Sequence, residues 1–420
     1  MKNLIGIVGL GYVGLPLINE ISKKFQTIGF DKNKKRIDEL NNSYDNTDEV
    51  SKINRKIKFT NILTELKNCK FIIVCVPTPI YRNKKPDLRN LRSACEDISK
   101  IISKGTIVVF ESTVYPGCTQ TFCRKILERK SKLKYNKDFF LGYSPERINP
   151  GKTNKKITDI IKITSGSNNY SARKIDNFYK KIIKAGTYLA PNMKTAEAAK
   201  IIENIQRDVN IALINELSMV FNKLNINTSE VIQAAATKWN FNSFYPGLVG
   251  GHCIGVDPYY FSFLAKKIGF NTKMILAGRK INDFIPNFIV EKTLKAASLR
   301  KIDIRKSKVL VLGSTFKEDC PDFRNSKTFD IMKLLVKKKI NFIISDPYFS
   351  KNKIKNNLHK YFINFKDLHK NKFDIVLITV GHHIYKKMGL KKIKKLAKKK
   401  SIIFDVKSIF KSKDKSVLSL

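Results

Sequence analysis

A tight glycine turn near the start of the chain constrains the fold more than any other feature of the sequence. Gly9, Gly11 and Gly14 directly follow the apolar run 4–8 and precede a helix-compatible stretch. The first glycine permits the turn, the second lets the backbone approach a pyrophosphate, and the third lets the helix pack closely on the strand. The helix N-terminus also favours phosphate charge. The turn therefore predicts a strand–helix–strand unit that binds a dinucleotide, rather than a loop that only reverses the chain.

An acidic residue after the second apolar run indicates which dinucleotide is bound. Asp31 lies seventeen positions after Gly14, at the end of the run 26–30. Its carboxylate can accept hydrogen bonds from a ribose diol but would repel a 2′-phosphate. NAD is therefore the predicted cofactor, in preference to NADP.

Short apolar runs recur in the first and last parts of the chain, separated by polar, helix-compatible stretches. This rhythm is typical of parallel strands joined by crossover helices. The expected strands are 4–8, 26–30, 71–76, 106–110, 139–143, 309–313, 342–346, 374–380 and 401–406.

The middle of the chain has a different pattern. Residues 195–224 contain neither Gly nor Pro and place apolar residues three and four apart, which predicts one long helix. We therefore expect an α/β fold in which two Rossmann-like, doubly wound domains are joined by a central helical domain. The expected boundaries are 1–194 for the NAD-binding domain, 195–300 for the helical domain and 301–420 for the second Rossmann-like domain.

The chain has a large positive charge, but this charge does not indicate a particular partner. There are 81 Lys and Arg against 35 Asp and Glu, which gives a net charge of +46. Nucleic acid or an anionic membrane surface would fit that charge, but the basic residues are scattered from end to end. We therefore expect no specific nucleic-acid partner. The densest basic segment, Lys391–Lys400, is expected to be the outer face of an amphipathic helix.

We expect neither a membrane span nor an export signal in this sequence. No stretch approaches the roughly 18 consecutive apolar residues that a membrane span requires. The opening MKNLIGIVGLGYVG runs into the glycine turn, where a secretory leader would need a cleavage site. The expectation is a soluble cytoplasmic protein without membrane insertion.

One of the seven cysteines stands apart from the other six. The seven are an odd number with no CxxC pair, so neither a disulfide framework nor a metal site is expected. Six are expected to be buried as small hydrophobic residues. Cys253 instead lies in the glycine-dense loop 246–258, four residues before Asp257. A thiolate stabilised by nearby donors is well suited to capture an aldehyde covalently.

Eight motifs carry a family resemblance that covers essentially the whole chain. They are GLGYVGLPL at 9–17, VPTP at 76–79, ESTVYPG at 111–117, YSPERINPGK at 143–152, AEAAKIIEN at 196–204, GGHCIGVDPYY at 250–260, ILAGRKIND at 275–283 and FKEDCPDFRNSK at 316–327. With these motifs the chain resembles the UDP-glucose/GDP-mannose dehydrogenases. Within that family it resembles the branch that acts on UDP-N-acetylglucosamine or UDP-N-acetylgalactosamine, the type used in Vi-antigen and O-antigen biosynthesis.

The resemblance implies a NAD-dependent, four-electron oxidation of the C6 hydroxyl of a UDP-N-acetylhexosamine to a carboxylate. Cys253 would attack the C6 aldehyde formed by a first hydride transfer, and the thiohemiacetal would give a second hydride to a second NAD. The resulting thioester would then be hydrolysed. Glu146 resembles the family's general base, and Thr113 would hold the active-site water.

Three further residues have implied roles in this chemistry. Lys200 and Asn204, four apart on one face of the long helix, would stabilise oxyanion charge and orient the reacting groups. Asp257 resembles the carboxylate that supports attack of water on the thioester.

The resemblance also implies which residues bind the cofactor and the substrate. The cofactor-binding residues would be Gly9, Gly11, Tyr12, Val13, Gly14, Asp31, Arg36, Thr78 and Thr113. The substrate-binding residues would be Glu146, Arg147, Lys200, Asn204, Tyr245, Gly250, Lys317 and Arg324. Lys317 and Arg324 belong to the part of the chain that resembles the family's UDP-binding half.

The residues after Glu146 favour the N-acetylhexosamine branch. UDP-glucose members usually continue with a Phe-Leu pair and a second Glu, whereas this chain continues Arg147-Ile148-Asn149-Pro150. UDP-glucose and UDP-N-acetylmannosamine remain alternative substrates, and an inactive nucleotide-sugar-binding regulatory protein is an alternative of another class. By resemblance, the product would feed a surface polysaccharide such as a capsule or O antigen, and the long helix would form a homodimer interface.

Overall fold

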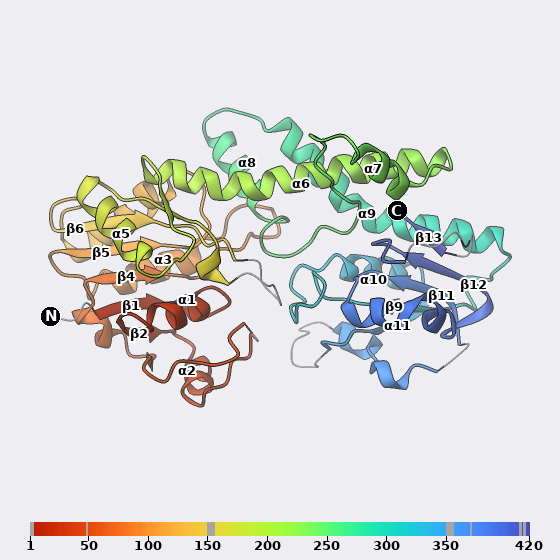
Figure 1. Cartoon of the computed structure of the whole chain (residues 1–420), viewed down its shortest axis with the longest axis horizontal. Coiled ribbons are helices and arrows are strands. Elements are labelled where there is room, and N and C mark those ends of the chain that lie inside the picture. Colours follow the sequence, from red (N-terminus) through yellow and green to blue (C-terminus); the bar gives the residue numbers. More distant parts are fainter. Residues whose placement is uncertain are drawn as a thin grey trace. The chain divides into compact units, whose positions relative to one another are not determined.

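The computed structural model describes residues 4–47, 49–148, 156–349, 357–369, 372–410, 414 and 417–420 (Figure 1). The chain forms two compact units. The first contains Met1–Glu203 and Tyr259–Asn271, and the second contains Asn204–Pro258 and Thr272–Leu420. The division falls inside the longest helix, α6, which runs over Met193–Lys223.

The first unit is built on a six-stranded parallel sheet with the order β3-β2-β1-β4-β5-β6. The chain steps outward from β1 to β3 and then returns to place β4 on the other side of β1. The loops after β1 and β4 therefore flank the point where the strand order reverses, which is where such sheets bind ligands. The strands are β1 Leu4–Val8, β2 Gln26–Phe30, β3 Lys58–Thr60, β4 Phe71–Val74, β5 Thr106–Phe110 and β6 Phe139–Tyr143.

Helices and one small additional sheet complete the first unit. Helix α1 turns Leu15, Leu17 and Ile18 inward, where they join a core that includes Ile7 and Ile73 of the central strands. The elements are α1 Gly14–Ile21, α2 Lys34–Asn41, η1 Leu63–Asn68, α3 Arg89–Ile98, η2 Thr119–Cys123, α4 Arg124–Ser131, η3 Ile157–Asp159, β7 Lys162–Thr164, α5 Asn169–Lys180 and β8 Thr187–Leu189, with β7 and β8 paired in parallel. Helix α8, Asp257–Lys267, begins in the second unit and continues in the first from Tyr259.

The second unit has a five-stranded parallel sheet with the order β10-β9-β11-β12-β13. Here the order reverses between β9 and β11. Ile331 of the crossover helix packs with Val311 and Ile344 in the core. The elements are α7 Thr228–Ala235, α9 Lys273–Leu299, β9 Lys308–Leu312, α10 Thr328–Lys337, β10 Asn341–Ser345, η5 Asn357–Tyr361, η6 Phe365–Asp367, β11 Phe373–Ile378, α11 His383–Lys394, β12 Ala397–Asp405 and β13 Val417–Ser419.

The predicted α/β class, the two parallel sheets and the long helix are confirmed. The expected runs 4–8, 26–30, 106–110 and 139–143 coincide with β1, β2, β5 and β6 residue for residue. The helix expected over 195–224 is α6, which begins two residues earlier and ends one residue earlier.

The prediction for Lys391–Lys400 is wrong in its second half. Helix α11 ends at Lys394, and strand β12 begins at Ala397, so the last lysines of the segment start a strand. Ile402 and Ile403 are buried in the sheet, where they pair with Ile375 and Val376 of β11. This long-range pairing extends the strand backward through the exposed lysines and overrides the local helical spacing.

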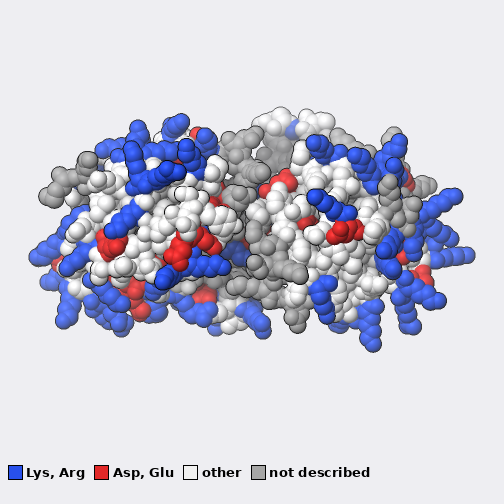
Figure 2. Space-filling view, turned by 90° about the horizontal axis from the view of Figure 1, so that it is seen from below, with Lys and Arg blue, Asp and Glu red and all other residues white. Residues whose placement is uncertain are grey.

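One face of the molecule shows the distribution of the basic side chains. On the face that Figure 2 shows, Lys and Arg side chains are spread widely between uncharged residues. Within the part of the chain that the structure describes, no helix is both long and apolar enough to cross a membrane.

Candidate active site

The glycine turn between β1 and α1 leaves open space where a phosphate group would need it. Gly9 has φ +94°, and a Cβ on Gly14 would lie 1.8 Å from the Gly9 carbonyl oxygen, so both positions require glycine. A Cβ on Gly11 would meet no atom within 4 Å. The second glycine is therefore not needed for packing. It keeps the backbone accessible, which fits the pyrophosphate of a dinucleotide.

Both backbone polar groups of Leu10 in this turn form hydrogen bonds with side chains, one with Asp31 and the other with Arg36. The Leu10 N–H donates to Asp31 Oδ2 at 3.0 Å, and Arg36 Nε donates to the Leu10 carbonyl at 2.9 Å. Arg36 is buried, and its terminal nitrogens donate to Asn46 and Asp45 at 2.9 and 2.8 Å. Arg36 thus supports the turn from within the protein.

The loops after β4 and β5 lie against each other beside the glycine turn. Thr78 Oγ1 donates to the Thr113 carbonyl at 2.7 Å, and Ser112 Oγ donates to the Val76 carbonyl at 2.6 Å. The Tyr260 hydroxyl donates to the Thr78 carbonyl at 2.9 Å. The structure therefore brings the predicted residues Thr78 and Thr113 together at the carboxyl edge of the first sheet.

Glu146 lies just after β6, in a loop that a buried ion pair supports. Glu146 is buried, and one of its carboxylate oxygens accepts the N–H of Ile148. Lys162 donates to the Pro145 carbonyl at 3.0 Å and to the Glu111 carboxylate at 2.6 Å. Burial raises the pKa of Glu111, although its pairing with Lys162 opposes this effect.

Sequence analysis did not identify the supporting residues of the Glu146 loop. Glu111 belongs to the ESTV motif, and its position directly after the apolar run of β5 is the only sequence feature that could have indicated its role.

The residues after Glu146 are only partly described. Arg147 pairs with Glu203 at 2.8 Å and donates to the Ile161 carbonyl at 2.9 Å. Asn149 and Pro150, which continue the branch-specific motif, lie outside the described residues.

A hydrogen bond joins helix α6 to the residue that begins helix α8. Asn204 Nδ2 donates to Asp257 Oδ2 at 2.6 Å, and both side chains are buried. Lys200, one helical turn before Asn204, is also buried. The backbone N–H groups of Val256 and Asp257 donate to the Cys253 carbonyl at 3.0 and 2.9 Å. Cys253 therefore occupies a tight turn immediately before α8.

Cys253 is the one partly exposed cysteine. The other six are buried as expected, namely Cys69, Cys75, Cys95, Cys118, Cys123 and Cys320. No cluster of His, Cys, Asp and Glu side chains suited to a metal ion occurs among the described residues.

The glycine-dense loop that carries Cys253 is fixed by two asparagines that sequence analysis missed. The side chain of Asn215 pairs with Gly247, accepting its N–H at 2.8 Å and donating to its carbonyl at 3.1 Å. The Gly251 N–H donates to the Asn325 carbonyl at 3.2 Å, and a Cβ on Gly250 would lie 2.4 Å from that oxygen. Glycine is therefore needed at 250 because another backbone passes beside it.

The Asp322 carboxylate contacts two side chains, His252 of the glycine-dense loop and Arg324 of the predicted UDP-binding region. His252 Nε2 lies 2.7 Å from the Asp322 carboxylate, which also accepts two nitrogens of Arg324. Burial favours the neutral acid, but the hydrogen bonds from His252 and Arg324 outweigh it and hold the pKa of Asp322 below its usual range. Tyr245, in contrast, is more than half exposed.

The predicted site residues are divided between the two units. Those in the first unit are Gly9, Gly11, Tyr12, Val13, Gly14, Asp31, Arg36, Thr78, Thr113, Glu146, Arg147 and Lys200. Those in the second unit are Asn204, Tyr245, Gly250, Cys253, Asp257, Lys317 and Arg324.

Three family models match the chain in order and leave few residues uncovered. They describe the NAD binding domain of the UDP-glucose/GDP-mannose dehydrogenase family at 3–183, its central domain at 194–284 and its UDP binding domain at 310–412. The chain belongs to the UDP-glucose/GDP-mannose dehydrogenase family. It is accordingly a nucleotide-sugar dehydrogenase with NAD as its cofactor.

Relatives match over the full chain. A UDP-N-acetyl-D-glucosamine 6-dehydrogenase of Salmonella typhi is 47% identical, with 98% of each chain covered. One of the same name from Pseudomonas aeruginosa is 47% identical, with 100% of each chain covered. Among solved structures, the UDP-D-ManNAc dehydrogenase of Pyrococcus horikoshii has a TM-score of 0.88 and 27% identity, with 99% of this chain and 98% of that chain covered.

The two glycines of the turn should respond differently to the same substitution. Gly11→Ala should fold normally because a Cβ has room there, but the methyl group would occupy the space that the pyrophosphate needs. We expect the dissociation constant for NAD to rise tenfold or more, which corresponds to about 1.4 kcal/mol. Gly14→Ala should instead lower the Tm, because its Cβ would clash with the Gly9 carbonyl. Titration calorimetry and thermal unfolding measure the two effects, and unchanged NAD affinity in folded Gly11→Ala would contradict this prediction.

Proposed function

We propose that this chain oxidises the C6 hydroxyl of UDP-N-acetylglucosamine or UDP-N-acetylgalactosamine to a carboxylate, with Cys253 as the covalent nucleophile. The observation that carries the proposal is the environment of Cys253. Cys253 is the one cysteine of seven that is not buried, and it begins a tight turn that ends at Asp257. The Asp257 carboxylate accepts a hydrogen bond from Asn204. The two bacterial relatives named as UDP-N-acetyl-D-glucosamine 6-dehydrogenases support the substrate class.

The role of Cys253 follows from the oxidation level of the product. An alcohol becomes a carboxylate by two two-electron oxidations, with one water added. Each oxidation consumes one NAD, which when bound would accept the hydride from C6. Addition of the Cys253 thiolate to the C6 aldehyde gives a thiohemiacetal, and oxidation at C6 converts this to a thioester. Water then cleaves the C–S bond, so the thiol is regenerated and the sugar leaves as a carboxylate.

The charged and amide side chains have complementary roles in this proposal. Glu146 acts as the general base, and Thr113 holds a water molecule. Lys200 and Asn204 stabilise negative charge on the C6 oxygen, because an ammonium and an amide N–H both donate to an oxyanion. The bond from Asn204 to Asp257 orients the carboxylate that assists attack of water on the thioester.

The remaining substrate contacts involve the nucleotide and the sugar. We propose that Lys317 and Arg324 bind the UDP moiety, with Arg147, Tyr245 and Gly250 among the sugar contacts. The family model of a UDP binding domain, matched at 310–412, supports the first of these assignments. Arg324 also pairs with the Asp322 carboxylate, which fixes the orientation of its guanidinium group.

The domain limits and the cellular role are also proposals. We retain 1–194, 195–300 and 301–420 as the NAD-binding, helical and UDP-sugar-binding domains. The enzyme would work in the cytoplasm, where NAD and UDP-sugars are metabolites, and its uronic acid product would enter a surface polysaccharide.

Substrate choice separates this proposal from its alternatives. We expect fastest NAD reduction with UDP-N-acetylglucosamine or UDP-N-acetylgalactosamine, and slower reduction with UDP-glucose and UDP-N-acetylmannosamine. Absorbance at about 340 nm with purified protein and each of the four sugars measures the rates. UDP-glucose as the best substrate would refute the branch assignment, and inactivity with all four would favour a regulatory nucleotide-sugar-binding protein.

Replacing the nucleophile should abolish complete oxidation. Wild-type protein should form two NADH per sugar, whereas Cys253→Ala should lose this turnover because no thioester can form. Cys95→Ala is a matched control, because Cys95 is buried in α3 and should affect stability but not stoichiometry. Two NADH per sugar from Cys253→Ala at the wild-type rate would exclude the covalent route.

We further propose that the chain forms a homodimer through helix α6. Leu213 and Val220 are seven residues apart, so they share one face of the helix, and Leu224 lies one residue beyond its end; each of the three is about half exposed or more. An exposed apolar row of this kind is stabilised by contact with another apolar surface. The long helix of a second copy provides one.

A charged side chain on this face of helix α6 should dissociate the proposed dimer. Light scattering should give wild-type protein twice the 48.2 kDa mass of one chain, and Leu213→Glu should shift it toward the monomer because a buried carboxylate is unfavourable. Lys306→Glu is the control, since it places the same residue at an exposed position before β9. A dimeric Leu213→Glu variant would exclude this face as the interface.

A further inference from the structure

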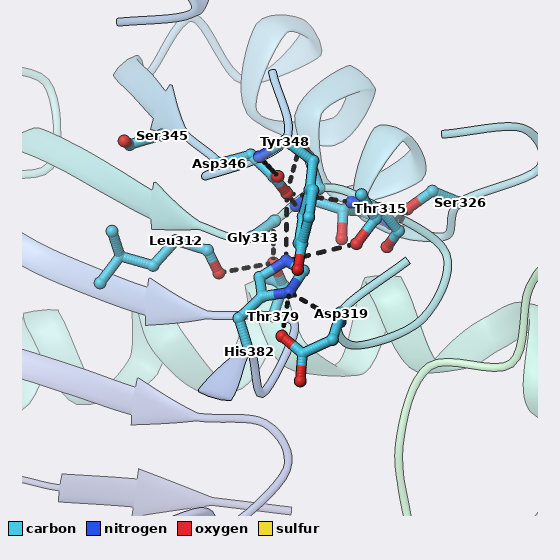
Figure 3. Close-up of polar contacts among 12 residues, drawn as sticks. Leu312, Gly313, Thr315, Asp319, Ser326, Ser345, Asp346, Tyr348, Thr379 and His382 are labelled. Atoms are coloured by element: carbon cyan, nitrogen blue, oxygen red, sulfur yellow. Dashed lines mark hydrogen bonds and ion pairs between the residues drawn. The ribbon is translucent and has the colours of Figure 1, made fainter. Parts of the chain in front are cut away.

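The loop that follows β9 is held by the ends of two neighbouring strands. This loop, residues 314–319, contains Lys317. Asp346 follows β10 and His382 follows β11, and both side chains point toward the loop in Figure 3. The ring of His382 is fully buried, and Asp346 is 4% exposed.

Asp346 fixes the first half of the loop. Its Oδ2 accepts the backbone N–H groups of Ser314 at 2.5 Å and Thr315 at 3.2 Å, and its Oδ1 accepts that of Tyr348 at 2.8 Å. Burial opposes ionisation, but the hydrogen bonds from His382 and from these backbone groups hold the pKa of Asp346 below its usual value. Asp346 is therefore a charged acceptor at neutral pH.

His382 fixes the second half of the loop, and its contacts define its protonation state. The backbone N–H of Asp319 donates to His382 Nδ1 at 3.0 Å. An amide can only donate, so Nδ1 carries no proton, and the ring is neutral with its proton on Nε2. The Asp319 carboxylate lies 3.6 Å from Nδ1, too far for a hydrogen bond. On the other side, Nε2 lies 3.3 Å from both Asp346 Oδ2 and Thr315 Oγ1.

Further hydrogen bonds fix the backbone on both sides of Lys317 in the sequence. Thr315 Oγ1 donates to the Lys317 carbonyl at 2.7 Å, and Asp319 accepts the N–H of His383 through its carboxylate. Asp319 also has φ +52°, a left-handed conformation that a non-glycine residue adopts at some cost. The contact from Asp319 to His382 holds the backbone in this conformation.

We infer that His382 is a positioning residue for nucleotide binding: its neutral ring holds the loop 314–319, and with it Lys317, in the conformation that receives the diphosphate of UDP. The inference rests on the proposed contact between Lys317 and the nucleotide sugar. His382 itself does not need to touch the ligand. Its effect is transmitted through Asp319 and Thr315, on the two sides of Lys317.

Three substitutions of His382 distinguish the contributions of its two ring nitrogens. In His382→Asn, the amide oxygen can take the place of Nδ1 and accept from Asp319. In His382→Gln, the amide reaches the place of Nε2 and loses that acceptor, and His382→Leu loses both. His383→Asn is the matched control, because it makes the same change in the neighbouring, exposed histidine.

The probe is UDP itself, measured by titration calorimetry on the full-length protein together with Tm and the KM values. We expect His382→Gln and His382→Leu to weaken UDP binding on the order of tenfold, the effect of one lost buried hydrogen bond. The KM for the UDP-sugar should rise in parallel, while the KM for NAD and the kcat change little. His382→Asn should recover most of the affinity, and His383→Asn should resemble wild type.

Two results would overturn the inference. One is wild-type UDP affinity in folded His382→Gln and His382→Leu. The other is loss of the folded protein in all three His382 variants, which would make His382 a core residue. Lys317→Ala tests the underlying assignment separately: if it binds UDP like wild type, the substrate proposal fails at Lys317, whereas weaker binding by Lys317→Ala with unaffected His382→Gln refutes the positioning role alone.

Discussion

In both units, a carboxylate at the end of the second strand accepts a backbone N–H from the loop that follows the first strand. Asp31 does this for Leu10 after β1, and Asp346 does it for Ser314 and Thr315 after β9. Parallel strands bring their carboxyl ends to one edge of a sheet, so the loops there crowd together and their backbone groups need partners. A carboxylate from the adjacent strand satisfies those groups and sets the shape of the loop.

The two loops then differ in what they offer to a ligand. The first keeps its backbone accessible, because Gly11 has no side chain and Arg36 supports the turn from inside. The second contains Lys317, the proposed contact of the nucleotide, and is braced by the buried His382. One arrangement suits a pyrophosphate that lies against backbone N–H groups, whereas the other suits a phosphate that meets a cationic side chain.

Local sequence pattern was sufficient where the structure depends on local features. The glycine spacing, the apolar runs of β1 and β2 and the uninterrupted helix α6 could each be predicted from a few adjacent residues. The strands β3, β7, β8 and β13 were missed because each is only three residues long and forms by pairing with a distant segment. In such short strands the apolar alternation is too brief to recognise.

Some residues of the candidate site could be predicted from local sequence pattern, and others could not. Cys253 and Asp257 are four residues apart within a glycine-dense loop, so sequence pattern pointed to them. The residues that hold the site, such as Lys162 with Glu111, are separated by about fifty positions and meet only in the folded chain. Nothing near Lys162 in the sequence distinguishes it from the many solvated lysines.

The lysines that open strand β12 have a consequence for the unfolded chain. Lys398, Lys399 and Lys400 stand one residue before the buried apolar run 402–404. Before the sheet forms, such a run is exposed and can pair with its counterpart in another copy. Adjacent positive charges oppose that approach, so these lysines act as gatekeepers against aggregation while the chain is being made.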